Sequence, residues 1–206
     1  MDFKKTKAPK IIDSWEGNDM SIIKNEIPIL EFDTEAAEVI TPIHEALDLQ
    51  LPRKCVFAFL GDYIDVYASG TETRQVSHFI SATKHYPIYI TTYKGEEIVL
   101  CQAPVGAAPA VQLLDWLIGY GVREIISAGS CGALEQFSES TFLVPFKALR
   151  DEGTSYHYAP PSRYMEISER ARHAIKETIL EHSMKYQEVI TWSTDGFFRE
   201  TKEKVA

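Results

Sequence analysis

Residues 98–134 read IVLCQAPVGAAPAVQLLDWLIGYGVREIISAGSCGAL, and this stretch decides the fold. Its opening run, 98–101, is apolar and partly β-branched, which is typical of a strand buried on both faces of a parallel or mixed sheet. Apolar side chains recur at helical spacing over 107–118 and predict a helix. A second strand at 124–128 leads into the turn 129–132, GSCG, so the whole stretch predicts a βαβ unit.

The GSCG turn is a candidate anion site. Gly129 and Gly132 flank Ser130 and Cys131, so successive backbone N–H groups and a hydroxyl can point at one anion. A glycine-bounded turn after a strand is also common as chain geometry alone. For Cys131 a small buried side chain is the favoured interpretation, because no basic residue lies nearby to activate the thiol.

Composition limits the class of protein. With 206 residues, 45% hydrophobic residues and no linker-like segment, the chain is long enough for one globular domain. A net charge of −9 argues against nucleic acid and against a membrane as partners, because their phosphates would repel it. No secretory signal or membrane-length apolar run is visible. Cys55, Cys101 and Cys131 lack metal-ligand spacing, so we expect no metal and reduced thiols in a cytoplasmic protein.

Patterning outside the central stretch predicts further elements. We expect an N-terminal extension and helix over 1–50 and a main domain over 51–206. The expected strands are 54–60, 87–93, 96–103, 142–149 and 188–193. The expected helices are 35–49, a short helix capped by Thr71 or Thr73 that runs through Ile80, and 168–184 capped by Ser168.

The central stretch resembles the nucleoside phosphorylase family that includes purine nucleoside phosphorylase and uridine phosphorylase. That family carries a glycine-rich turn, a helix of the form PAxxxLxxLxxxG, a strand, and GSCGxL or GTTGxL. The matching residues here are Gly106, Pro109, Ala110, Leu114, Leu117, Gly121, Ile126, Gly129, Ser130, Cys131, Gly132 and Leu134. The resemblance extends over about 56–199 and implies an α/β fold, a three-layer sandwich with a central mixed sheet.

The resemblance also implies a phosphate site, from which this chain departs twice. Ser130 and the backbone N–H groups of Gly61 and Gly132 are the implied phosphate ligands. The family's arginine after the first strand is replaced by Asp65, and its arginine before the GSCG turn is replaced by Ser127. A carboxylate there would repel a phosphate dianion by on the order of several kcal/mol at an effective dielectric near 20.

The implied base and sugar contacts lie near the C-terminus. Residues 194–200, TDGFFRE, resemble the family's segment in which the first aromatic stacks on the nucleobase, so Phe197 is the base-stacking candidate and Phe198 is expected in the core. Asp195 and Arg199 could read the base edge, or pair with each other and only shape the loop. Tyr156 and His157 could touch the sugar or base, or belong to a solvated turn.

These residues predict a nucleoside phosphorylase-like protein that cleaves the N-glycosidic bond of a purine or pyrimidine nucleoside. Phosphate would be the nucleophile and co-substrate, no cofactor is expected, and family members suggest a homo-oligomer, either a dimer or a trimer of dimers. Family members continue beyond the position of Ala206 with segments that hold the ribose and assist the leaving base, so the resemblance implies a truncated member whose catalytic residues stay unassigned. Whether it is an enzyme is open: the alternatives are a catalytically incomplete nucleoside-binding protein and a hydrolytic nucleosidase.

Overall fold

The structure is a computed structural model that describes residues 22–34, 38–70 and 72–206. The main strands are β3 Lys54–Phe59, β4 Arg74–Ile80, β5 His85–Tyr93, β6 Glu96–Gln102, β7 Glu124–Gly129, β8 Thr141–Asp151, β9 Tyr164–Glu166 and β10 Lys185–Thr194, and short β1 Ile22–Ile23 pairs with β2 Phe32–Asp33. The helices are α1 Tyr63–Ala68, α2 Ala107–Gly119, α3 Glu169–Glu181 and α4 Lys202–Val205. Short 3-10 helices are η1 Pro28–Leu30, η2 Thr154–His157 and η3 Phe197–Arg199.

The main sheet is mixed and has helices on both faces. Its strand order is β4-β5-β6-β3-β7, with β3 parallel to both β6 and β7 and with β5 antiparallel to β4 and β6. Helix α2 packs Leu113, Trp116 and Leu117 against Phe57 on one face, and α1 packs Ile64 against Ala58 on the other. The expected three-layer α/β architecture with a central mixed sheet is therefore confirmed.

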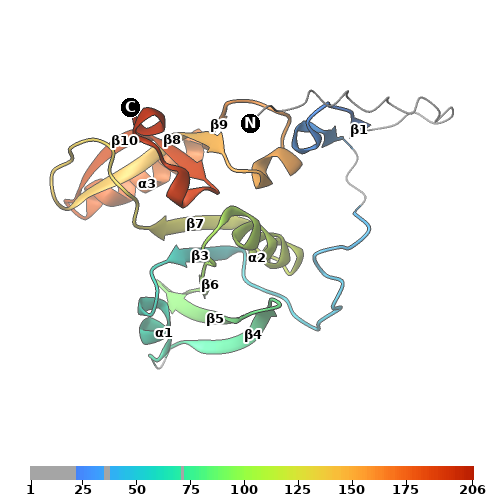
Figure 1. The fold of residues 1–206 in the computed structure, drawn as a ribbon. Helices are drawn as coiled ribbons and strands as arrows, with labels where there is room; N and C mark the ends of the chain where they lie inside the picture. Colours follow the sequence, from blue (N-terminus) through green and yellow to red (C-terminus); the bar gives the residue numbers. More distant parts are fainter. Residues whose placement is uncertain (1–21, 35–37, 71) are drawn as a thin grey trace, which may run out of the picture.

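A second sheet lies beside the first, as Figure 1 shows, with β8, β9, β10, α3 and α4 on the far side of β7 from β3. Its order is β10-β8-β9, with β10 parallel to β8 and β9 antiparallel to it. The register moves from Val189↔Pro145 to Ile190↔Lys147, which leaves Phe146 without a partner in β10. Such an extra residue is a β-bulge, and the preceding Pro145, which has no N–H, is commonly found at one.

The sequence predicted most of these elements at close to their observed bounds. The strands expected at 54–60, 87–93 and 96–103 correspond to β3, β5 and β6, and the helix at 107–118 corresponds to α2. The helix expected at 168–184 corresponds to α3, and Ser168 caps it, because its Oγ accepts a hydrogen bond from the Ala171 N–H.

Two helix predictions are wrong. Over the described part of 35–49, residues 38–49 form turns and bends, held by Trp116 Nε1 donating to Glu45 Oε2 (3.0 Å) and by the Leu47 N–H donating to the Tyr120 hydroxyl (3.2 Å). The segment expected as a helix through Ile80 is instead β4, whose pairing with β5 brings Val76 and Phe79 onto the core. In both segments tertiary contacts override local helical patterning. Residues 1–21 of the expected N-terminal extension lie outside the described residues.

Candidate functional site

Two glycine turns leave the main sheet at the same edge. Strands β3 and β7 are parallel, and their last residues, Phe59 and Gly129, are register partners. Ser130 follows Gly129 directly and Gly61 follows Phe59 after one residue, so the sheet brings the two predicted phosphate turns together. Gly61 has φ +59°, a left-handed conformation that favours glycine, and a Cβ placed on Gly61 or Gly132 would meet nothing within 4 Å. Both turns therefore face open space.

Asp65 and Ser127, the residues at the two positions where the resemblance implies arginines, lie close to these turns in the sequence. Asp65 lies on α1 and accepts a hydrogen bond from the Tyr89 hydroxyl (3.1 Å); burial, and then this contact, raise the pKa of Tyr89. Ser127 is exposed on β7. In the described chain, no lysine or arginine side chain donates a hydrogen bond to Gly61, Ser130 or Gly132. What these turns offer an anion is thus backbone N–H groups and the Ser130 hydroxyl.

The Cys131 thiol is exposed, so the expectation that it is buried is wrong. The turn projects beyond the end of β7, where nothing in the described chain covers it. Cys55 and Cys101 are buried free thiols as expected, and a hydrogen bond between them, together with burial, raises the pKa of Cys101.

Two aromatic rings stand on the surface after β10. Phe197 is 72% exposed and Phe198 is 94% exposed, and their rings meet edge-on with centroids 5.1 Å apart. The expectation that Phe198 lies in the core is wrong, because η3 begins two residues beyond the sheet and turns both rings outward. An exposed ring on a short turn is available to stack on a flat ligand.

The two candidate base-edge residues do not pair with each other. Asp195 Oδ2 accepts a hydrogen bond from the Gly153 N–H (2.8 Å) and so links the loop after β10 to the loop after β8. The Arg199 side chain is exposed, and within the described residues it makes no hydrogen bond or ion pair. The alternative interpretation, in which Asp195 and Arg199 form an ion pair with each other, is therefore wrong.

The loop that carries Tyr156 and His157 is organised by a buried arginine. Arg150 donates from Nε to Ser155 Oγ (2.8 Å) and from its terminal nitrogens to Ser162 Oγ and to the carbonyls of 159 and 160. Its guanidinium lies 4.1 Å from the centre of the Tyr156 ring, and the Tyr156 hydroxyl donates to the Arg150 carbonyl (3.3 Å). The loop is thus ordered around Tyr156, while His157 is exposed.

The base candidates and the phosphate candidates form two separate groups. The β8–β10 register joins the loops that hold Asp195, Phe197 and Tyr156, whereas Gly61 and Ser130 belong to the main sheet. In the described ranges, no hydrogen bond, ion pair or ring contact connects one group to the other. Two surface hollows, of about 440 and 410 Å³, lie along α3 and at the start of β8 and β10, and neither is lined by a candidate residue.

The described chain has neither a membrane-crossing helix nor a group of metal-binding side chains. None of its helices has both the length and the apolar character that crossing a bilayer requires. Across 22–34, 38–70 and 72–206, no three His, Cys, Asp or Glu side chains are grouped so that they could hold a metal ion.

Comparison with known proteins assigns the family. The family model described as "Phosphorylase superfamily" matches residues 55–206, which is well over half of the chain. The chain belongs to the phosphorylase superfamily. Its glycine turns, η3 and the loop after β8 all fall inside the matched range.

Curated members of this superfamily match over a shorter stretch. A guanosine phosphorylase from Halorubrum lacusprofundi is 29% identical over 83 residues, which is 40% of this chain and 34% of that protein. A uridine phosphorylase from Haemophilus influenzae is 25% identical over 83 residues, 40% of this chain and 33% of that protein. The matched segment therefore spans about a third of the length of either relative.

Solved structures share the fold over more of the chain. Uridine phosphorylase from Vibrio fischeri superposes with a TM-score of 0.63 at 22% identity, covering 75% of this chain and 63% of that one. Purine nucleoside phosphorylase from Toxoplasma gondii, in complex with immucillin-H, gives 0.63 at 15% identity, covering 75% and 61%. These likenesses establish the fold, and this superfamily member spans about three fifths of the length of each.

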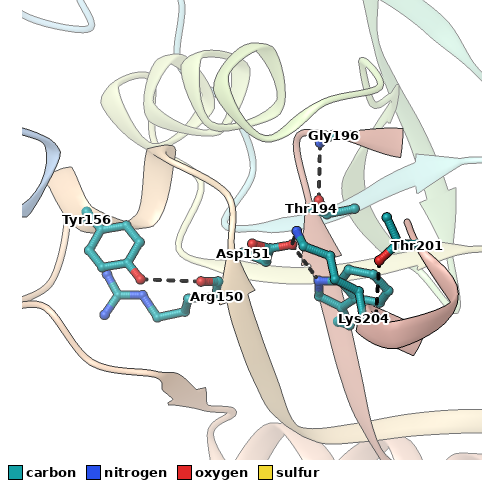
Figure 2. A network of polar contacts seen from close by, with 8 residues as sticks. Arg150, Asp151, Tyr156, Thr194, Gly196, Thr201 and Lys204 are labelled. Carbon is teal, nitrogen blue, oxygen red and sulfur yellow. Dashed lines mark hydrogen bonds and ion pairs between the residues drawn. The ribbon is translucent and has the colours of Figure 1, made fainter. Parts of the chain in front are cut away.

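Sequence reasoning missed the polar network that holds the two loops together, which Figure 2 shows around Arg150 and Asp151. Asp151 Oδ2 accepts from Trp192 Nε1 (3.1 Å) and from Lys204 Nζ (3.0 Å). The donating Lys204 ammonium, followed by the Trp192 indole, holds the pKa of Asp151 below its usual value. The sequence did hold one signal for this network: the oppositely charged residues Arg150 and Asp151 stand next to each other at the end of an apolar strand.

Proposed function

We propose that this chain is a nucleoside phosphorylase-like protein that binds a purine or pyrimidine nucleoside and cleaves its N-glycosidic bond with phosphate. The observation that carries the proposal is the register of β3 and β7, which sets the Gly61 and Ser130 turns side by side within the matched superfamily range. Backbone N–H groups at adjacent strand ends make a suitable anion cradle. The attacking phosphate would lie against these turns.

The nucleoside would be held by the second group of candidates. Phe197 is an exposed ring on η3 and would stack on the base, with Arg199 free to donate to the base edge. Asp195 Oδ2 accepts a hydrogen bond from the Gly153 N–H, and Oδ1 would accept a second hydrogen bond from the base. Tyr156 is held in place by Arg150 and His157 is exposed, and both are kept as candidates for contact with the sugar or base.

The test is a liquid-chromatography assay of base release from inosine, adenosine, uridine and methylthioadenosine, with and without phosphate. We expect free base only in the presence of phosphate. The variant Ser130→Ala removes the hydroxyl from the proposed phosphate turn, so it should release base more slowly than the wild type when phosphate is present. Equal release with and without phosphate would refute phosphorolysis.

Hydrolysis is a second candidate, favoured by one specific observation. Asp65 stands where a phosphate-binding arginine is expected and Ser127 stands at the other arginine position, so a phosphate dianion would gain no charge pairing at either place. Water carries no charge and would not meet this penalty. Base release that does not depend on phosphate would support a nucleosidase, and nucleoside binding without any release would support a binding protein.

Assembly and location belong to the same proposal. Strand β7 is at the end of the main sheet and is exposed along most of its length, with Ile126 44% exposed, and such a strand favours association. We therefore propose a homo-oligomer, a dimer or trimer of dimers, in the cytoplasm. Light scattering during gel filtration tests the assembly, and a monodisperse monomer at micromolar concentration would overturn it.

A further inference from the structure

The segment between β10 and the end of α4 is tied at both of its ends to one residue, Asp151. At its start, the Asp195 N–H donates to the Asp151 carbonyl (3.3 Å). At its end, Lys204 Nζ donates to the Asp151 carboxylate (3.0 Å). Phe197 lies between these two attachments, so the position of its ring depends on a loop that is closed on Asp151.

The interior of this loop is held mainly by short local contacts. The Gly196 N–H donates to Thr194 Oγ1 (3.1 Å), the Arg199 N–H donates to the Gly196 carbonyl (2.7 Å), and Thr201 caps α4 through the Lys204 N–H (3.3 Å). The Phe197 ring itself contacts only Phe198 among the aromatic rings of the described chain. Among the described residues, the hydrogen bonds between this loop and the strand ends lie near its two ends: Asp195 with Gly153 and Asp151 at the start, and Lys204 with Asp151 at the end.

The Lys204 contact is more than an isolated surface ion pair. The same Asp151 oxygen accepts from Trp192 Nε1, and Thr194 also donates to Asp151, so the carboxylate is oriented before Lys204 reaches it. The Lys204 ammonium also lies 6.0 Å from the centre of the Trp192 ring. Figure 2 shows the Lys204 side chain directed back from α4 toward Asp151. A preoriented acceptor lowers the ordering cost that usually cancels exposed ion pairs.

From this geometry we propose that Lys204 and Asp151 are a positioning pair that closes the segment 195–204 and thereby sets Phe197 for stacking on a nucleobase. The proposal rests on the proposed function, since it needs a base for Phe197 to meet. Lys204 touches no ligand in this scheme and acts through the loop. Lys202, the other lysine of α4, forms no ion pair within the described residues and so offers a comparison on the same helix.

The test is a double-mutant cycle on nucleoside affinity, measured by isothermal titration of the full chain with uridine and with inosine. Lys204→Met removes the charge and keeps the length of the side chain. We expect it to raise the Kd of the better-binding nucleoside by about five-fold, which corresponds to about 1 kcal/mol at 1.4 kcal/mol per factor of ten. Lys202→Met is the matched control and should leave the Kd unchanged, and Lys204→Arg should restore most of the affinity.

The cycle separates positioning from general destabilisation. If Lys204 acts through Phe197, then Lys204→Met should add nothing to Kd in a Phe197→Ala background, because the ring that it positions is gone. An equal five-fold effect in both backgrounds, or no effect of Lys204→Met on a wild-type chain that binds nucleoside, would overturn the proposal. A wild-type chain that binds neither nucleoside would instead refute the proposed function, and with it any role for the pair in base stacking.

Discussion

Replacing Phe197 by alanine separates the stability of the chain from its binding of a nucleobase. The ring is 72% exposed, so only about a quarter of its surface is buried. Since full burial of a phenylalanine stabilises by about 1.5–3 kcal/mol, the free energy of unfolding should fall by less than about 1 kcal/mol. Stacking on a base is worth about 1–3 kcal/mol, so the Kd for a nucleoside should rise by about five-fold to about a hundred-fold.

The assay is isothermal titration with uridine and inosine, alongside urea unfolding of the same variant. Phe198→Ala is the matched control, because Phe198 is the adjacent residue, is 94% exposed and carries the same ring. We expect Phe198→Ala to change the Kd by at most about three-fold, on the order of 0.5 kcal/mol. Equal losses of affinity in the two variants would refute the assignment of Phe197 as the stacking residue, and unchanged affinity in Phe197→Ala would remove the base site from this loop.

Three further predictions concern the turns, the core and the polar network. Gly61→Ala should destabilise by about 1–2 kcal/mol in urea unfolding because Gly61 has φ +59°, whereas Gly132→Ala, with equal open space and no left-handed φ, should change stability by less than about 1 kcal/mol; matching losses would contradict this reasoning. Leu113→Ala should cost about 2–5 kcal/mol, because the side chain is fully buried between α2 and the sheet, and a thermal melt that does not move would argue against this core. The Lys204 contact lowers the pKa of Asp151 in the folded chain, so its stabilisation is present above about pH 4 and is lost as pH falls through that lowered value. At roughly 1 kcal/mol or less for so exposed a pair, the stability difference between wild type and Asp151→Asn should shrink from pH 6 to pH 3, and a difference that grows on acidification would reverse the sign of the argument.

The sequence predicted the βαβ unit well because its signals are local. The glycine at 106, the helical repeat of apolar residues and the glycines at 119 and 121 set the bounds of α2 without help from the rest of the chain. The GSCG turn likewise follows β7 at the expected residue. The pairing of β3 with β7 gives the shared edge, and no local pattern contains it, because β3 lies between β6 and β7, the two strands of the βαβ unit.

The wrong secondary-structure predictions, and the contact that was missed, fall where residues distant in sequence decide the structure. Residues 74–80 carry a polar, helix-compatible pattern, and only their pairing with β5 makes them a strand. The turns at 38–49 depend on Trp116 and Tyr120, more than seventy residues away. The Lys204–Asp151 contact joins residues 53 positions apart, so no spacing rule applied along the chain would have found it.

The bulge at Phe146 decides which changes of length β8 can accept. Side chains alternate between the two faces of a strand, and Arg150 and Asp151 are consecutive, so each serves a different loop. Deleting Phe146 would remove only the unpaired residue, because Pro145↔Val189 and Lys147↔Ile190 would become consecutive pairs and Arg150 and Asp151 would keep their partners in β10. Deleting one residue between 147 and 149 would instead shift Arg150 and Asp151 by one place and move each to the opposite face of the strand. Insertions and deletions should therefore be accepted in the loop at 133–140, before the strand, and rejected between Lys147 and Asp151.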